Sequence, residues 1–170
     1  MDILEKYYRD VKYYRIISDI LENDKFKKMD GYRHHGMTRL DHSLKVSYYA
    51  YRIAVKFRLD YVSVARAGLL HDFFLNEDLN EIKQRFSMFF HPYKSLENTC
   101  KYFNVNDMEK DIIITHMFPT LPHKVPKYLE SWLVSFVDKV IAAGEFYESY
   151  ARPYAYKLSN LYLMLLIFKG

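Results

Sequence analysis

Apolar residues recur at helical spacing along almost the whole chain, and no segment shows the strict alternation that is typical of a β-strand. From about Ile3 to Leu21 this pattern predicts a first amphipathic helix. The polar segment Glu22–Met37 contains two glycines and predicts a long connection. The apolar side of the first helix consists of Leu4, Tyr7, Tyr8, Val11, Tyr14 and Ile17.

Capping residues mark the next two helices. Thr38, followed by Asp41, has the spacing of a capping box and predicts a helix that continues to about Leu59. Asp60 can cap a third helix, predicted from Tyr61 to about Asp72. The apolar sequence AGLL near the end of this third helix indicates that it is buried.

The second half of the chain predicts several shorter helices and one long one. The segment Asn76–Phe90 indicates only a short helix near Asp78–Phe86, and Pro92 suits the first turn of the helix after it. Prolines at three positions between 119 and 126 predict a loop. The later helices are predicted from Pro92 to about Phe103, from the box-like pair Asn106 and Glu109 through DIIITHM, from Pro126 to Tyr150, and from Leu158 to Phe168.

Together these elements predict an all-α fold, a single compact bundle of six to eight helices around one core. The chain has 170 residues, of which half are hydrophobic and 18% are aromatic, and that is enough for one domain. We expect residues 1–170 to form this domain, with a helix and loop in 1–36, the chemical motifs in 37–144 and a C-terminal helix in 151–170.

The charge and the apolar runs exclude some classes of protein. The 25 basic and 21 acidic residues give a net charge of +4 and are scattered, so no nucleic-acid groove is predicted, although a phosphorylated metabolite would be attracted. The most apolar run, Leu158–Phe168, is too short to span a bilayer, and the N-terminus lacks the apolar core of a signal peptide. The single cysteine, Cys100, is predicted to be a buried small hydrophobe. We therefore expect a cytoplasmic protein without membrane partners.

Polar residues interrupt four of the apolar segments. His42, His71-Asp72, His116 and Asp138 each lie on a predicted helix among apolar neighbours. One such residue is usually a hydrogen-bonded core histidine or part of a structural ion pair, because burial without a partner is costly. A shared metal ion would offset all of these costs together.

The sequence then resembles a known family, the HD superfamily of metal-dependent phosphohydrolases. The resemblance rests on RLDHSLKVSYYAYRIA, ARAGLLHD, THM and SFVDKV, in this order between about Met37 and Gly144. It implies a minimal metal site of one histidine, the His-Asp pair and a distant aspartate. Members with two metals add two further histidines. In this chain the implied ligands are His42, His71, Asp72 and Asp138, with His91 and His116 as the two additional histidines.

The resemblance also implies how the ligands divide between two metals. Asp72 would bridge them, His42, His71 and Asp138 would complete one, and His91 and His116 the other. Such a set without thiolate suits iron or manganese and leaves zinc, cobalt, nickel and magnesium open. The expected nucleophile is a metal-bound hydroxide that attacks a phosphoryl group.

Two basic residues beside these ligands are candidates for contact with substrate phosphate. Arg39 precedes His42 by one turn, and Lys139 follows Asp138 as in the common Asp-Lys pair of the family. Several dinuclear relatives carry a lysine where this chain has Leu75, and Glu77 or Asp78 are the nearby acids. Residues expected to be surface or core groups without a catalytic role are Lys94, Arg66, His123, His34, His35 and Trp132.

Three functions remain open at this stage. The leading hypothesis is an enzyme that hydrolyses the phosphoric ester or anhydride of a small metabolite, a nucleotide or dinucleotide, with dinuclear diadenosine-polyphosphate hydrolases as the nearest relatives. Some HD proteins with the same ligands are di-iron oxygenases, and others are non-catalytic binding modules. The aromatic surface would also allow a homodimer.

Overall fold

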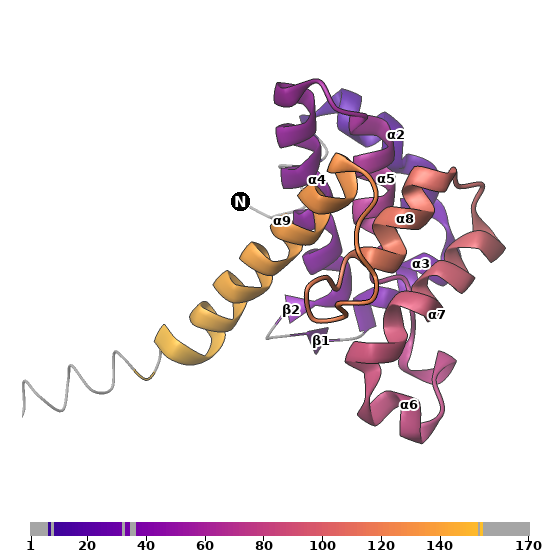
Figure 1. Cartoon of the computed structure of the whole chain (residues 1–170), viewed down its shortest axis with the longest axis vertical. Helices are drawn as coiled ribbons and strands as arrows, with labels where there is room; N and C mark the ends of the chain where they lie inside the picture. Colours follow the sequence, from indigo (N-terminus) through magenta and orange to yellow (C-terminus); the bar gives the residue numbers. More distant parts are fainter. Residues whose placement is uncertain (1–6, 8, 32, 35–36, 153, 155–170) are drawn as a thin grey trace, which may run out of the picture.

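The computed structural model describes residues 7, 9–31, 33–34, 37–152 and 154. It confirms the all-α fold class (Figure 1). The exception among the described residues is a short hairpin of two strands with two residues each, in which β1 (Arg33–His34) pairs antiparallel with β2 (Met37–Thr38). The α-helices are α2 (Val11–Glu22), α3 (Asp24–Lys27), α4 (Arg39–Phe57), α5 (Tyr61–Leu70), α6 (Glu81–Arg85), α7 (Ser87–Tyr102), α8 (Asp107–Thr115) and α9 (Leu129–Phe146). Short 3₁₀ turns, η1 (Lys28–Gly31) and η2 (Asn76–Asp78), and a π-helical segment, η3 (Tyr147–Ala151), complete the order.

The helix starts predicted from capping residues are confirmed. The Thr38 hydroxyl accepts a hydrogen bond from the Asp41 N–H at 3.1 Å, and Asp60 caps α5. Asn106 and Glu109 exchange the two reciprocal bonds of a capping box at the start of α8. These local bonds satisfy the first N–H groups of each helix. They therefore fix the residue at which the helix begins, independently of how the helix packs against its neighbours.

Two predicted boundaries in the N-terminal part are wrong. The helix expected from Ile3 to Leu21 is interrupted at Asp10, whose side chain accepts from the Tyr13 N–H at 3.1 Å and caps α2. The expected connection Glu22–Met37 contains α3, η1 and the hairpin. The predicted helix Leu158–Phe168 lies outside the described residues. Within the described part of the chain, no helix combines the length and apolar character needed to cross a bilayer.

The predicted role of Pro92 is also wrong. Helix α7 begins at Ser87, and so Pro92 lies in its second turn rather than its first. Pro92 has no N–H, so the helix lacks the hydrogen bond that this position would otherwise make to the carbonyl of Met88. As a result His91 is held inside a helix instead of in a loop before it.

Helices α4 and α5 pack most closely, with α9 and α8 against them (Figure 1). A Cβ on Gly68 of α5 would lie 3.0 Å from the backbone Cα of Ser47 in α4, and the absent side chain permits this approach. Cys100 and Trp132, both expected in the core, are exposed. They lie on the outer faces of α7 and α9, while the inner faces carry buried polar groups.

Candidate metal centre

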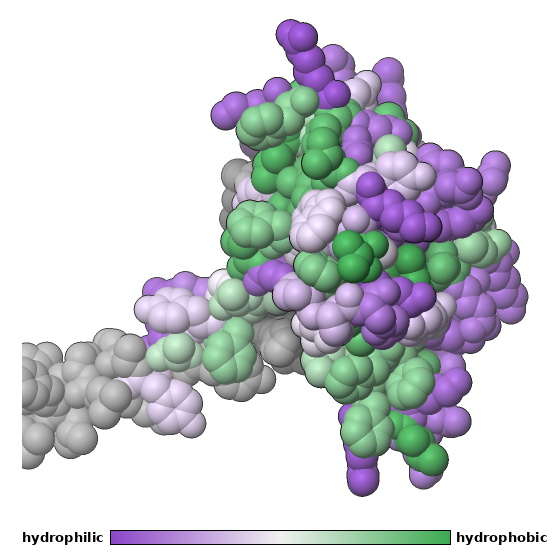
Figure 2. Space-filling view, in the orientation of Figure 1, coloured by the Kyte–Doolittle hydropathy of each residue, from purple (hydrophilic) through white to green (hydrophobic). Residues whose placement is uncertain are grey.

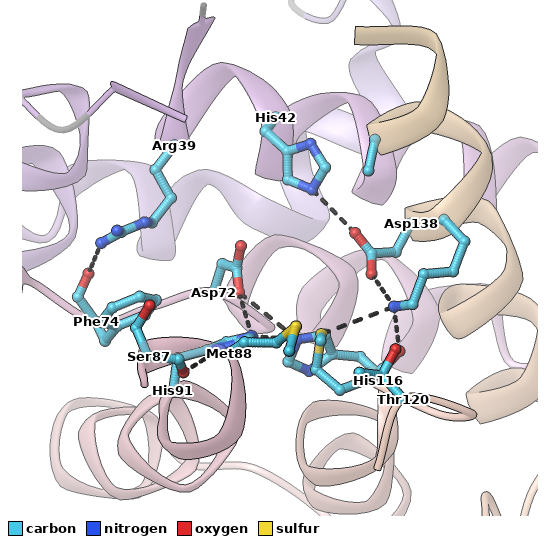
Figure 3. A pocket seen from close by; sticks show the side chains of 13 residues that line it. Arg39, His42, Asp72, Phe74, Ser87, Met88, His91, His116, Thr120 and Asp138 are labelled. Carbon is cyan, nitrogen blue, oxygen red and sulfur yellow. Dashed lines mark hydrogen bonds and ion pairs between the residues drawn. The ribbon is translucent and has the colours of Figure 1, made fainter. Parts of the chain in front are cut away.

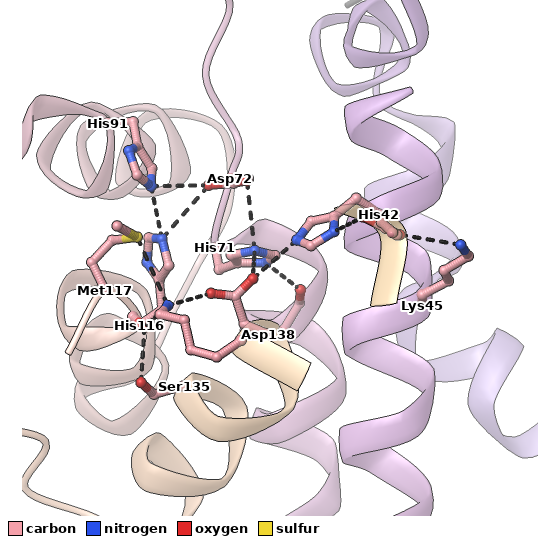
Figure 4. Close-up of polar contacts among 12 residues, drawn as sticks. His42, Lys45, His71, Asp72, His91, His116, Met117, Ser135 and Asp138 are labelled. Atoms are coloured by element: carbon pink, nitrogen blue, oxygen red, sulfur yellow. Dashed lines mark hydrogen bonds and ion pairs between the residues drawn. The ribbon is translucent and has the colours of Figure 1, made fainter. Parts of the chain in front are cut away.

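The structure brings all six predicted ligands together from five helices (Figures 3 and 4). His42 lies in the first turns of α4, and His71 and Asp72 follow the last residue of α5. His91 comes from α7, His116 ends α8, and Asp138 lies in the middle of α9. All six side chains are buried. The helix ends and faces that the sequence predicted therefore converge on one point.

Three of the histidines are oriented by their own helices. In each of them Nδ1 lies within 2.8 Å of a backbone carbonyl three or four residues earlier. A carbonyl can only accept, so Nδ1 carries the hydrogen and Nε2 presents its lone pair to the site. The pairs are His71 with Gly68, His91 with Ser87, and His116 with Ile113.

His42 is oriented by a carboxylate that the sequence analysis missed. Its Nδ1 lies 2.8 Å from Oε2 of Glu145, which is buried in α9. The other oxygen of Glu145 accepts from Lys45 at 3.1 Å. A carboxylate behind a histidine fixes the ring and raises its basicity as a ligand. The available signal was spacing, because Glu145 follows Asp138 by seven residues, two helical turns along the same face.

Lone pairs face one another across the centre. Nε2 of His91 lies 2.8 Å from Nε2 of His116, so two lone pairs are opposed there. Nε2 of His42 lies 3.0 Å from Oδ1 of Asp138 and donates to this oxygen when His42 is protonated. Nε2 of His71 and Oδ1 of Asp72 are buried without a hydrogen-bond partner. Two acceptors at such distances repel unless a cation lies between them. This donor set therefore fits metal ions.

The donors form two overlapping groups. His42, His71 and Asp138 lie within mutual reach of one ion, and His71, Asp72 and His116 within reach of another. Oδ2 of Asp72 lies 3.7 Å from Nε2 of His71, while Oδ1 lies 3.2 Å from Nε2 of His91. The two oxygens of Asp72 therefore face different histidines (Figure 4), as those of a bridging carboxylate would.

The electrostatics of the site favour the protonation states that metal ions need at the two aspartates and at His116. His42 is the exception, because burial is outweighed by its bonds to Asp138 and Glu145, which raise its pKa to about 10, so that a metal ion would replace a proton there. Burial would raise the pKa of Asp72, but the surrounding imidazoles, His71 first, lower it below its usual value. Burial is likewise outweighed at Asp138, where His42 and His71 hold the pKa well below normal. Burial lowers the pKa of His116 well below 6.5. Ionised carboxylates and neutral imidazoles are the forms that coordinate metals.

The two basic candidates differ in their contacts. Lys139 Nζ lies 2.6 Å from Oδ2 of Asp138, which leaves Oδ1 toward the histidines, and it also donates to the His116 carbonyl. Arg39 donates to the carbonyl of Phe74. Both line a pocket of about 370 Å³ above the ligands (Figure 3).

The other residues considered from sequence lie outside the centre. Asp78 accepts from the Leu75 N–H and pairs with Lys25, so it holds the loop after the His-Asp pair. His123 is exposed and contacts Tyr93. Lys94 pairs with Glu97, Arg66 pairs with Asp19 and Glu109, Glu77 pairs with Lys25, and the side chains of His34 and His35 are outside the description.

Comparison with known proteins gave one match. A family model described as the HD domain matches residues 39–143, a range that contains all six predicted ligands. No curated protein and no solved structure matches the chain.

Proposed function

The chain belongs to the HD-domain family, within the metal-dependent phosphohydrolase superfamily, and we propose that its buried centre hydrolyses a phosphoric ester or anhydride of a small phosphorylated metabolite. One observation carries this proposal. Imidazoles from four helices converge on two ionised carboxylates, and backbone carbonyls fix the Nε2 lone pairs of three of these histidines. Such preorganised donors match the requirements of a two-metal hydrolytic site.

The chain's own residues would take distinct parts. His42, His71 and Asp138 would hold one ion and His91 and His116 the other, with Asp72 between them. When bound, two ions supply an activated water and neutralise charge on the phosphoryl oxygens. Glu145 orients His42, and Lys139 donates a hydrogen bond to Oδ2 of Asp138. Iron and manganese fit this donor set best, and a nucleotide substrate stays a prediction.

Metal content and phosphate release test the proposal together. The full chain, made without a histidine tag or chelator, should contain about two iron or manganese ions per chain by elemental analysis. It should release phosphate from phosphorylated metabolites equally well with and without oxygen. Strict dependence on oxygen, with loss of activity when manganese replaces iron, would instead identify a di-iron oxygenase. No bound metal after reconstitution would indicate a binding module.

A further inference from the structure

Apart from the metal ligands and the two basic residues, the pocket has a mainly apolar lining. Of these other lining residues, four carry hydrocarbon, aromatic or thioether groups and two carry hydroxyls. Its volume of about 370 Å³ is at the small end of the range for ligand pockets. Methionine side chains adapt to apolar and aromatic ligands. The apolar residues are Phe74, Met88, Met117 and Ala142, and the hydroxyls belong to Ser87 and Thr120.

The two basic side chains of this pocket, among the described residues, are both engaged by the protein. The guanidinium of Arg39 donates to the Phe74 carbonyl and stacks 3.8 Å from the centre of the Phe74 ring. Lys139 Nζ is bonded to Asp138 and to the His116 carbonyl. A polyphosphate chain needs several cations along its length. The pocket therefore suits one phosphoryl group, held at the metal centre.

The apolar lining continues to the surface. Met88 lies in the first turn of α7, lines the pocket and is 46% exposed. Phe86, Phe89 and Phe90 surround it in sequence and are also exposed. Figure 2 shows apolar side chains gathered over α6 and the start of α7. An exposed apolar patch beside a pocket is typical of a ligand-binding groove.

We infer, on the basis of the proposed phosphohydrolase function, that the substrate carries a single phosphoryl group on an apolar organic group. The apolar part packs against Met88, Met117 and Ala142 and extends toward Phe86 and the neighbouring phenylalanines. Dinucleoside polyphosphates and sugar phosphates do not match this lining, the first because of their charge and the second because their hydroxyls would lose hydration.

Binding of stable phosphonates tests the inference apart from turnover. In titration calorimetry on the metal-loaded protein, hexylphosphonate should bind at least about tenfold more tightly than methylphosphonate, because each buried methylene adds affinity. Met88→Glu should remove this difference without loss of metal. The matched control is Phe57→Glu. Phe57 is exposed at the C-terminal end of α4, away from His42 in the first turns of that helix, and this variant should keep the difference in affinity. Equal affinities in the unaltered protein would overturn the inference.

Turnover distinguishes failure of the inference from failure of the proposed function. Hexyl phosphate and glycerol 3-phosphate are both alkyl monoesters with similar leaving groups, so their comparison reports on the pocket. We expect a lower KM for hexyl phosphate than for glycerol 3-phosphate or diadenosine tetraphosphate. Preference for either alternative overturns the inference and leaves the phosphohydrolase. Tight hexylphosphonate binding without hydrolysis of any of the three overturns the proposed function.

Discussion

At the scale of single residues, the centre depends on how individual oxygens and nitrogens are aimed. Oδ1 of Asp72 faces His91 and His116, while Oδ2 faces His71. The two oxygens of Asp72 therefore contact different histidines. As a bridging ligand, Asp72 would affect both metal positions, whereas His42 and His116 each belong to one donor group.

Replacement of Asp72 by Ala should therefore remove both metals. The substitution takes away a bridging ligand and a negative charge together, and we expect less than about a tenth of the normal metal content. Elemental analysis after dialysis measures this. Asp107→Ala, an exposed aspartate at the start of α8, is the control and should retain full content. Retention of one metal by the Asp72 variant would show that this side chain does not bridge.

Replacement of Glu145 by Gln should weaken binding at the His42 position. Without the carboxylate the ring of His42 loses its orienting partner, and loss of such partners typically costs about 10- to 100-fold in metal affinity. Competition titration with a metal-binding dye measures the affinity. Glu148→Gln, on the exposed face after α9, should change nothing. Unaltered affinity in the Glu145 variant would show that packing alone holds His42.

At the scale of elements, the α4–α5 contact sets the distance between His42 and the His-Asp pair. This contact is closest where Gly68 meets the backbone of Ser47. Ser47 also accepts from the buried Tyr13 hydroxyl at 2.8 Å and donates to the Ala65 carbonyl, so it cannot move easily. The register of the two helices is therefore fixed one turn before the ligands His71 and Asp72.

Gly68→Ala should destabilise the protein and loosen the metal site. Its new Cβ would meet backbone rather than a side chain that can rotate away, and such overpacking costs about 1–3 kcal/mol. Urea unfolding measures the loss, and metal titration should show weaker binding. Gly144→Ala is the matched control, because nothing lies within 4 Å of its Cβ in α9. That variant should be unchanged or more stable by up to about 1 kcal/mol.

At the scale of the whole molecule, the stability of the protein should depend on pH once metal is removed with a chelator. Burial opposes the charge on His42, but its bonds to Asp138 and Glu145 prevail and raise its pKa to about 10. The folded state then binds a proton that the unfolded state has released above about pH 6.5. The stabilisation is complete below pH 6.5 and is lost as the pH rises toward 10.

The free energy of unfolding of the chelator-treated protein should therefore fall between about pH 7.5 and 9.5. Urea unfolding at several pH values measures the slope. His42→Gln should flatten it, since no proton is then taken up on folding. The metal-loaded protein should show no such fall, because metal replaces the proton on His42. A steep slope in the His42 variant would assign the dependence to another group.

The sequence alone determined the fold class and the identity of the candidate ligands. Caps such as Thr38 and Asn106 act within four residues, and polar residues in apolar helices are conspicuous because burial is costly. These signals depend on residues close together in the sequence, and the structure contains the caps that they predict. The starts of α4 and α8 follow from them, and so do the ligands on four of the helices, whereas His91 on α7 is implied by the resemblance to the HD superfamily.

Only the tertiary structure decided what each group faces. Glu145 shares a helix face with Asp138, but its contact with His42 joins residues 103 positions apart. The opposed lone pairs of His91 and His116 and the exposure of Trp132 likewise depend on which face each helix turns to its neighbours. Helix packing sets these faces through the sum of many weak contacts, which no short stretch of sequence contains.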